Sequence, residues 1–443
     1  MHPGLHALAA SLRAQLPPRA SGMVVALSGG ADSACLLAAA AAAAAGVMPL
    51  RAVHVDHGLQ AAAADFRRLC TTLCAHLGVP LSILTVAVGA APGASLEEAA
   101  RDARYAALAA QLAPGECLLT AHHAEDQAET VLLQALRGCG PAGLAGMPRC
   151  RPLGRGEHLR PFLEVPRREL GRCVASLGLD TAVDPMNRDP RFDRAHLRLR
   201  VWPGISERWP GAAGALGRTA RHAAEALELL NALADEDLAG LRDGAELSVA
   251  RLRALAPARR RNALRRWIGE RAVPPPAARL AEALRQCLDA REDHVPAIIW
   301  GEHALRRYRG RIYLTPAVPA RFADPLSWNP HVEPTLELGH GLGRLRWVER
   351  AGGLAAALLP PTLTVRARCG GESLRLAPRA PTRTVQHLCQ AEGVPPWMRA
   401  ALPFVYAGPR LIAVADRWLE ARVCGARTEP GAGIDWEDAP ALL

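Results

Sequence analysis

Lysine is absent from this chain of 443 residues, and all 53 of its basic residues are arginine. This absence excludes the phosphate loop Gly-x-x-x-x-Gly-Lys, because that motif places a lysine ammonium over the phosphates. Aromatic residues are scarce as well, at 4%, but 50% of the residues are hydrophobic and 22% are charged. These proportions are typical of folded domains and exclude a mostly disordered chain.

Paired cysteines and long apolar runs are also missing. The eleven cysteines include no Cys-x-x-Cys, which argues against a zinc ribbon, a thioredoxin-type pair and a disulfide scaffold. Residues 33–50 and 69–96 lack Asp, Glu and Arg, but the first stretch is weakly apolar and the second is broken by Gly and Pro. Because the N-terminus also lacks a secretory signal, we expect a cytoplasmic protein without a membrane segment.

The positive charge is unevenly distributed. The 53 arginines stand against 43 acidic residues, which gives a net charge of +10. Residues 361–427 alone hold ten arginines and four acids, a net of +6. An enzyme that acts on small molecules does not need such an excess of positive charge, whereas a protein that binds a polynucleotide does.

Strand-like and helix-like segments alternate over the first 150 residues. Strands are expected at 23–27, 50–55, 81–88 and 117–121, each followed by a helix. This order predicts an α/β fold with a doubly wound parallel sheet, in which ligands bind at the carboxyl ends of the strands. We predict that residues 1–215 form this catalytic domain.

In the remainder of the chain the composition and the predicted secondary structure change twice. Residues 216–330 are predicted to be a mostly helical domain with a hairpin that turns at Gly310. Residues 331–360 are crowded with Pro and Gly and are predicted to be a linker with some strand. Residues 361–443 are expected to form a small mixed α/β domain, and its excess of arginine suggests that it binds a polynucleotide.

The strongest chemical signal follows the first expected strand and reads Ser28-Gly29-Gly30-Ala31-Asp32-Ser33. Glycines let a backbone approach an anion closely, and the amides at a helix N-terminus point toward it. Asp32 would repel phosphate unless Mg²⁺ lies between them. The segment therefore predicts a phosphate site with a metal, and a Gly-rich turn with a capping Asp is the alternative.

A second polar cluster follows the fourth expected strand. His122, Asp126 and Glu129 are spaced to share one face of a helix. Two carboxylates in this place are suited to Mg²⁺ or to the ammonium group of a substrate. Zinc is not favoured, because no third neutral ligand lies in register. Helix-start acids that complement the macrodipole are the alternative.

Two groups of arginines complete the candidate site. Arg104 stands beside Tyr105 on an expected helix, where an arginine suits a phosphate or the charge that develops in a transition state. Arg191, Arg194 and Arg198 form a basic stripe suited to phosphates. In both cases a solvated helix face is the alternative interpretation.

Together these motifs resemble the tRNA(Ile)-lysidine synthetase family, which belongs to the N-type ATP pyrophosphatases. The Ser-Gly-Gly-x-Asp-Ser loop is common to that superfamily, whereas the segments 101–105, 122–147 and 187–198 resemble the narrower family. The C-terminal stretches 393–397 and 411–418 do so as well. The resemblance covers nearly the whole chain.

The resemblance implies a two-step ligase reaction. ATP adenylates O2 of the wobble cytidine in an isoleucine tRNA with a CAU anticodon and releases pyrophosphate. The ε-amine of free L-lysine then attacks C2 and expels AMP, which leaves lysidine and switches decoding from AUG to AUA. The implied cofactors are ATP and Mg²⁺, and the implied partners are this tRNA and lysine. The oligomeric state, a homodimer included, is left open.

Residue roles follow from the same resemblance. The implied ATP-binding residues are Ser28, Gly29, Gly30, Ala31, Asp32 and Ser33, with Asp32 also holding Mg²⁺. Arg104 would stabilise the adenylation transition state, and His123 would lie by the phosphates. Asp126 and Glu129 would receive the lysine, with Asp126 also counted among the catalytic residues. The implied tRNA contacts are Arg191, Arg194, Arg198, Arg366, Arg368, Arg379 and Arg383.

Two other functions share part of this pattern. A tRNA 2-thiocytidine or 2-thiouridine synthetase is built on the same ATP loop, but such enzymes usually rely on paired cysteines or an iron–sulfur cluster. A non-catalytic tRNA-binding protein with a decayed nucleotide fold is the second alternative, against which the intact Asp32, Arg104 and Asp126 argue. Glu125 replaces the Asp usual in the family's motif, so no metal role is expected for it.

Overall fold

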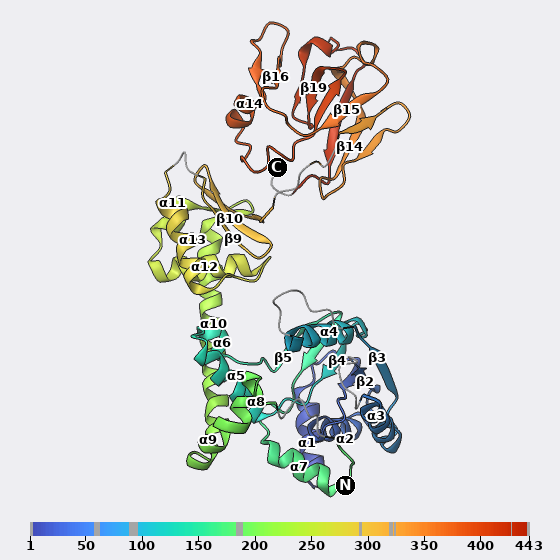
Figure 1. Ribbon diagram of the computed structural model, residues 1–443, viewed down its shortest axis with the longest axis vertical. Coiled ribbons are helices and arrows are strands. Elements are labelled where there is room, and N and C mark those ends of the chain that lie inside the picture. Colours follow the sequence, from blue (N-terminus) through green and yellow to red (C-terminus); the bar gives the residue numbers. More distant parts are fainter. Residues whose placement is uncertain are drawn as a thin grey trace. The chain divides into compact units, whose positions relative to one another are not determined.

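The computed structural model describes residues 3–56, 63–87, 96–182, 189–291, 295–318, 322, 325–426 and 428–440. The chain forms two compact units, residues 1–230 and 231–443, and each unit has hydrophobic cores of its own (Figure 1). No helix in the described part of the chain is long and apolar enough to cross a bilayer.

A six-stranded sheet forms the centre of the first unit. Its strand order is β3-β2-β1-β4-β6-β5. The strands are β1 (Gly22–Ala26), β2 (Leu50–Asp56), β3 (Leu81–Thr85), β4 (Glu116–Leu119), β5 (Cys150–Leu153) and β6 (Gly156–Leu159). Neighbouring strands are parallel except β5, which pairs with β6 as an antiparallel hairpin. The carboxyl ends of β1, β4 and β6 therefore meet at one edge of the sheet, and the predicted parallel sheet is confirmed.

Helices cover both faces of this sheet (Figure 1). One core holds the helices α1 (Pro3–Gln15), α2 (Ala31–Ala44), α3 (Ala63–Leu77) and α7 (Arg167–Ser176). Helix α4 (Leu96–Ala110) packs on the other face, where Leu108 meets Val24 and Val53. Alternation along β1 explains the two faces, because Val24 points opposite to its neighbours Met23 and Val25.

The acidic motif and the arginine stripe lie on helices that follow the strands of the sheet. Helix α5 (Ala124–Leu136) begins just after β4 and is followed by α6 (Pro141–Leu144). Of the arginine stripe, Arg194 lies on α8 (Asp193–His196) and Arg198 on a π-helical turn at Leu197–Val201, whereas Arg191 precedes α8. Helix α9 (Trp202–Arg208) and the long α10 (Ala212–Leu241) come next in the chain.

The first core of the second unit combines helices with a sheet. The helices are α11 (Val249–Ala254), α12 (Pro257–Gly269) and α13 (Ala277–Asp289). The sheet has the order β7-β8-β11-β10-β9, with β7 (Arg242–Asp243), β8 (Glu246–Ser248), β9 (Ala297–Trp300), β10 (His303–Tyr308) and β11 (Arg311–Pro316). The predicted hairpin is confirmed, because Tyr308 lies opposite Arg311 and Gly310 has a φ of +71° between them.

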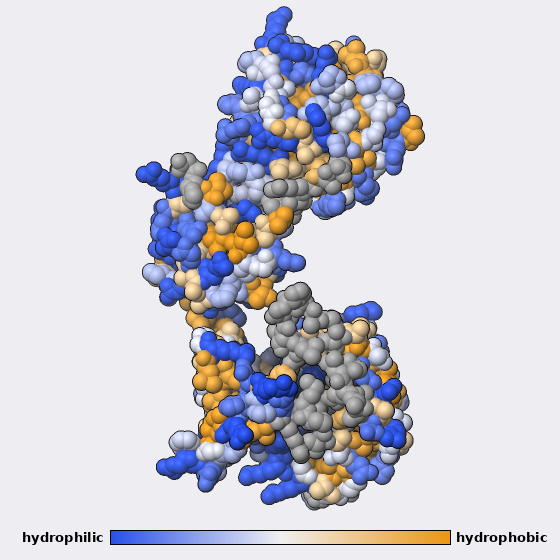
Figure 2. Space-filling model, in the orientation of Figure 1, coloured by the Kyte–Doolittle hydropathy of each residue, from blue (hydrophilic) through white to orange (hydrophobic). Residues whose placement is uncertain are grey.

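The second core of this unit lies between small sheets. One sheet consists of β12 (Leu326–Trp328), β15 (Leu363–Arg366), β18 (Phe404–Ala407), β19 (Arg410–Val414) and β20 (Trp418–Leu419). The others are formed by β13 (Thr335–Glu337), β14 (Arg344–Leu354) and β21 (Ala432–Glu437), and by β16 (Ser373–Leu374) and β17 (Arg383–Thr384). Helix α14 (Val385–Ala391) packs beside them, and Figure 2 shows hydrophilic side chains gathered on its side of this body.

The stretch 331–360 is predicted from the sequence to be a linker with some strand. In the structure it is instead folded as part of this body. It contains β13 and β14, and β14 pairs with β21 near the end of the chain. Leu345 and Leu354 are buried in the same core as Phe404. The other predicted domain limits, at 215 and 330, stay predictions.

Candidate active site

The loop between β1 and α2 has the geometry of an anion cradle. Gly29 has a φ of +84°, and a β-carbon there would lie 3.2 Å from Cδ1 of Phe66, so glycine is favoured. The Ser33 hydroxyl donates to the carbonyl of Gly30 at 2.9 Å and lies 3.0 Å from the hydroxyl of Ser28. These contacts fix the loop on the first turn of α2, whose amides have no capping side chain.

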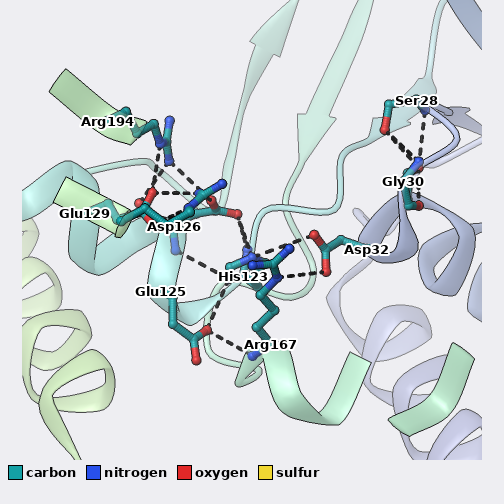
Figure 3. Close-up of polar contacts among 11 residues, drawn as sticks. Ser28, Gly30, Asp32, His123, Glu125, Asp126, Glu129, Arg167 and Arg194 are labelled. Carbon is teal, nitrogen blue, oxygen red and sulfur yellow. Dashed lines mark hydrogen bonds and ion pairs between the residues drawn. The ribbon is translucent and has the colours of Figure 1, made fainter. Parts of the chain in front are cut away.

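Asp32 reaches from the first turn of α2 toward α5 and α7 (Figure 3). Its Oδ2 lies 3.9 Å from Nε2 of His123, and its Oδ1 lies 3.8 Å from Nε of Arg167. Burial raises the pKa of Asp32 and Asp126 adds to this rise, whereas His123 and Arg167 oppose it. A lone carboxylate beside a phosphate loop suits Mg²⁺, which typically takes one or two protein carboxylates together with substrate phosphates.

His123 connects Asp32 to the acids of α5. Its side chain, 3% exposed, caps the helix together with Asp126 in a reciprocal capping box. Its Nδ1 lies 3.1 Å from Oε2 of Glu125, and its Nε2 lies 3.3 Å from Oδ2 of Asp126. Burial lowers the pKa of His123, but the three surrounding carboxylates outweigh burial and raise it. In the protonated ring Nδ1 donates to Glu125 in place of accepting from the Asp126 amide.

Asp126 and Glu129 form ion pairs with two arginines of the predicted basic stripe. Arg198 donates from Nε to Oε1 of Glu129 at 2.7 Å and from Nη2 to Oδ1 of Asp126 at 2.9 Å. Arg194 donates from Nε to Oε2 of Glu129 at 3.0 Å, and Glu129 is only 1% exposed. Burial favours a raised pKa for Asp126, but His123 and the arginines hold its pKa below the usual value. We call Asp126, Glu129, Arg194 and Arg198 the paired group.

The third arginine of the stripe lies apart from this group. Arg191 pairs with Asp189 at 2.6 Å, and its side chain is 85% exposed. Asn187 and Arg188, which belong to the same motif, lie outside the described residues. Two of the three predicted tRNA-binding arginines are therefore joined to the predicted lysine-binding acids, and one points to solvent.

A buried chain of hydrogen bonds lies behind His122. Nη2 of Arg160 donates to Nδ1 of His158 at 3.2 Å, and Nε2 of His158 lies 2.8 Å from Oγ1 of Thr120. The same Thr120 oxygen lies 2.9 Å from Nδ1 of His122. Burial, helped by Arg160, lowers the pKa of His158 to about 2, and burial lowers that of His122 to about 3. Both rings are therefore neutral at pH 7.

Arg104 belongs to a group of arginines gathered around one aromatic ring. The guanidinium carbons of Arg101, Arg104 and Arg151 lie 5.3, 5.4 and 5.6 Å from the ring centroid of Tyr105. Burial lowers the pKa of Arg104, and the charge of Arg101 lowers it further. Arg160, 2% exposed, interacts with the side chain of Tyr105 as well. Among the described residues none of the four guanidiniums has an ion pair, and we call them the unpaired group.

Several residues at this edge were not predicted from the sequence. Arg151 lies within β5 and Arg160 directly follows β6, and neither belongs to a motif. His158 is a single histidine within β6. Glu125, to which no metal role was given, accepts from the amide of Arg167 at 2.9 Å and so ties α5 to α7. The only available signal for Arg160 is its position directly after a parallel strand.

The four C-terminal arginines predicted to contact tRNA lie in different surroundings. The guanidinium of Arg366 lies 4.1 Å from the ring centroid of Tyr406, and Arg368 forms an ion pair with Glu372. Arg379 and Arg383 are exposed and form no ion pair within the described part of the chain.

Comparison with known families agrees with this geometry. The PP-loop domain family matches residues 5–205, the TilS substrate binding domain matches residues 247–313, and the TilS substrate C-terminal domain matches residues 363–436. The fold, the loop and the first match define a PP-loop protein that uses ATP. The two further matches narrow this class to one kind of enzyme.

The relatives with curated names agree with the narrower class. The tRNA(Ile)-lysidine synthase of Alkalilimnicola ehrlichii is 45% identical over 402 residues, which are 90% of each chain. That of Pseudomonas aeruginosa is 41% identical over 421 residues, 91% of this chain and 92% of the relative. The chain belongs to the tRNA(Ile)-lysidine synthase family. Among solved structures, a U34-tRNA thiolase from Methanococcus maripaludis is 16% identical with a TM-score of 0.41 and covers 49% of this chain and 79% of its own.

Proposed function

We propose that this chain joins free L-lysine to C2 of the wobble cytidine in an isoleucine tRNA with a CAU anticodon, at the expense of ATP. One observation carries the proposal beyond the family match. His123 lies between Asp32 of the phosphate loop and Asp126 of the acidic helix, within 3.9 Å of the first and 3.3 Å of the second. The proposed phosphate site and the proposed ammonium site therefore adjoin, as a reaction in which lysine displaces AMP from an ATP-activated cytidine requires.

In the first step the triphosphate would lie on residues 28–33, with the amides of α2 and the hydroxyls of Ser28 and Ser33 as donors. Asp32 would hold Mg²⁺, which supplies positive charge to the phosphates when bound. Arg104 would stabilise the charge that develops as O2 of cytidine attacks the α-phosphate and pyrophosphate leaves. His123, with its raised pKa, would add a cation beside the phosphates.

In the second step Asp126 and Glu129 would bind the amino acid through its ammonium charge. Since both carboxylates are already paired with Arg194 and Arg198, the ammonium must share them with the arginines or replace one. An arginine that leaves the acids would be free to bind a tRNA phosphate. In this way the two roles expected for the paired group become successive states of the same residues.

The remaining tRNA contacts would come from Arg191 and from the C-terminal body, where Arg366, Arg368, Arg379 and Arg383 are the candidates. We place the reaction in the cytoplasm, where its tRNA and amino acid substrates are available. The excess of arginine in this body predicts binding that weakens steeply as salt is added.

The direct test incubates the full chain with ATP, Mg²⁺, radiolabelled lysine and an unmodified CAU-anticodon tRNA. Lysine-dependent label in the tRNA is the expected result, and its absence would overturn the proposal. Sulfur incorporation together with lysine-independent release of pyrophosphate would instead identify a thiolase.

Substitution of Asp32 tests the assignment of the first step. Asp32→Ala removes the carboxylate beside the phosphate loop, so pyrophosphate release should fall by roughly a thousandfold or more. The measurement is release of labelled pyrophosphate with saturating tRNA. Glu169→Ala, which removes an exposed acid from the first turn of α7, is the control and should keep normal activity.

A further inference from the structure

The positive charge of the unpaired group is not neutralised by any acidic side chain among the described residues. Arg101, Arg104 and Arg151 lie around the ring of Tyr105, and Arg160 interacts with the same side chain. The face of an aromatic ring attracts a cation weakly, by about 0.5–2 kcal/mol. It does not offset the mutual repulsion of several guanidiniums in a partly buried place, which ordinarily requires an anion.

Two described acids near these arginines in sequence, Glu157 and Asp102, do not serve as this anion. Glu157 precedes His158 on β6 and therefore points to the opposite face of the sheet, where its Oε2 accepts from Sγ of Cys150 at 3.0 Å. Asp102 follows Arg101 directly on α4 and is exposed, and adjacent residues of a helix do not face each other. His122 and His158 are neutral and bring no negative charge.

A buried donor of the group also lacks a partner. Arg160 is 2% exposed; its Nη1 donates to the carbonyl of Pro148 at 2.7 Å and its Nη2 to His158. Its Nε is buried and has no hydrogen-bond acceptor. Because a buried N–H without an acceptor costs about 1–3 kcal/mol, this atom is a second and independent sign of an absent acceptor.

We infer that the unpaired group is a phosphate-binding site, separate from the loop at residues 28–33. Planar guanidinium groups match phosphate oxygens in pairs of hydrogen bonds, so several arginines in one place select phosphate over smaller anions. The carboxyl ends of β4 and β6, which carry His122 and Arg160, put this group on the same sheet edge as the ATP loop. The inference rests on the proposed function only for the source of the phosphate.

Two sources offer the same chemistry, a backbone phosphodiester of the tRNA and a phosphate of ATP. The exposed position of Arg151 on the outer strand β5 favours the RNA, because the loop at residues 28–33 already offers a cradle to the nucleotide. A phosphodiester held here would fix the strand beside the target cytidine and thus present its base to the adenylation site.

The test compares two exposed arginines of the β5–β6 hairpin in the full chain. Arg151→Gln removes one cation of the group, and Arg155→Gln removes the same charge from the turn of the hairpin, away from Tyr105. Dissociation constants are measured for unmodified CAU-anticodon tRNA over a series of KCl concentrations, and for a non-hydrolysable ATP analogue. Because both residues are exposed, neither substitution should affect folding, which circular dichroism checks.

For an RNA phosphodiester, Arg151→Gln should weaken tRNA binding roughly tenfold and reduce the slope of log K against log salt by about 0.7–0.9. Binding of the ATP analogue should not change. A neutral methylphosphonate beside the target cytidine should weaken binding to the wild-type protein by a similar factor and have no further effect on Arg151→Gln. For a phosphate of ATP, the loss should instead appear with the analogue. Arg155→Gln should match the wild-type protein in every assay.

Equal affinities of Arg151→Gln and Arg155→Gln for both ligands would overturn the inference. Labelled lysine incorporation by the wild-type protein separates this result from a failure of the proposed function. If lysidine forms and the two variants behave alike, only the phosphate site is refuted. If the wild-type protein binds neither tRNA nor ATP, both proposals are refuted.

Discussion

The paired and unpaired groups lie on one edge of the same sheet, but their buried arginines differ in whether a carboxylate neutralises their charge. In the paired group, Arg194 and Arg198 are joined to Asp126 and Glu129 by contacts of 2.7–3.4 Å. In the unpaired group the guanidiniums surround Tyr105, and the described residues supply no counterion. The difference indicates that the first group is electrostatically complete without a ligand, whereas the second is complete only with an anion.

The two groups should also differ in the free energy that is required to bind a ligand. A cationic substrate at the paired group has to compete with two guanidiniums that are already in place. An anion at the unpaired group meets donors whose charge is not yet neutralised. We therefore expect weak intrinsic affinity for the amine and strong, salt-sensitive affinity for phosphate.

The largest expected effect is on stability and comes from the same substitution made in each group. Arg198→Gln leaves Glu129 buried with one guanidinium instead of two, and breaking a buried pair of this kind costs about 3 kcal/mol. Arg101→Gln removes one of several like charges, so the free energy of unfolding should change by no more than about 0.5 kcal/mol in either direction. Urea unfolding followed by circular dichroism measures both. Equal losses would show that the two groups do not differ in charge balance.

A second prediction separates the two chemical steps. Glu129→Gln keeps the shape of the side chain but removes a charge that the ammonium of lysine needs, so transfer of lysine to tRNA should fall roughly a hundredfold. Pyrophosphate release, which depends on Asp32 and Arg104, should be partly retained. The two rates are measured with labelled lysine and labelled pyrophosphate in parallel. If both rates fell equally, Glu129 would not act in lysine binding.

The smallest effect concerns pH and tests the neutral histidines behind the unpaired group. His158, with a pKa of about 2 in the folded chain, titrates near 6.5 when unfolded. The unfolded state therefore binds one more proton below pH 6.5, and stability falls as pH decreases, by about 1.4 kcal/mol per pH unit for each such histidine. His122, with a pKa of about 3, contributes in the same direction.

The control for this prediction is His158→Gln, whose amide can accept from Arg160 and donate to Thr120. Between pH 6 and pH 4 the variant should lose stability less steeply than the wild-type protein, by about 1.4 kcal/mol per pH unit. Unfolding free energies measured at several pH values in this range give the two slopes. Identical slopes would mean that His158 is not buried in its neutral form.

The parts of the fold that follow from local pattern were predicted from the sequence. Buried apolar strands alternate with helices, and Gly29 after β1 has the positive φ that glycine favours. The hairpin of β5 and β6 was not predicted, because residues 150–152 are exposed and show no alternation of polar and apolar residues. Residues 331–360 look like a linker locally, but their strands find partners up to about ninety residues away in the chain.

In the candidate site, too, the features that a contiguous segment encodes were predicted, and the contacts between distant segments were not. Residues 28–33 could be predicted because a contiguous segment encodes both the turn and the donors. The partners of Arg194 and Arg198 are separated from them by 65 to 72 residues, and a stripe on a helix looks the same whether it faces water or acids. Arg160 has no neighbouring motif, so only the assembled sheet brings it beside Tyr105.

The hydrogen-bond chain from Arg160 to His122 has a direction. A guanidinium can only donate, so Nδ1 of His158 accepts and its Nε2 carries the hydrogen that goes to Thr120. The hydroxyl of Thr120 then gives its own hydrogen to Nδ1 of His122, and the remaining hydrogen of that ring sits on Nε2. His122 thus presents an N–H to its surroundings and has no free lone pair with which to accept a proton. His122 therefore cannot be the group that deprotonates an amine bound at this edge.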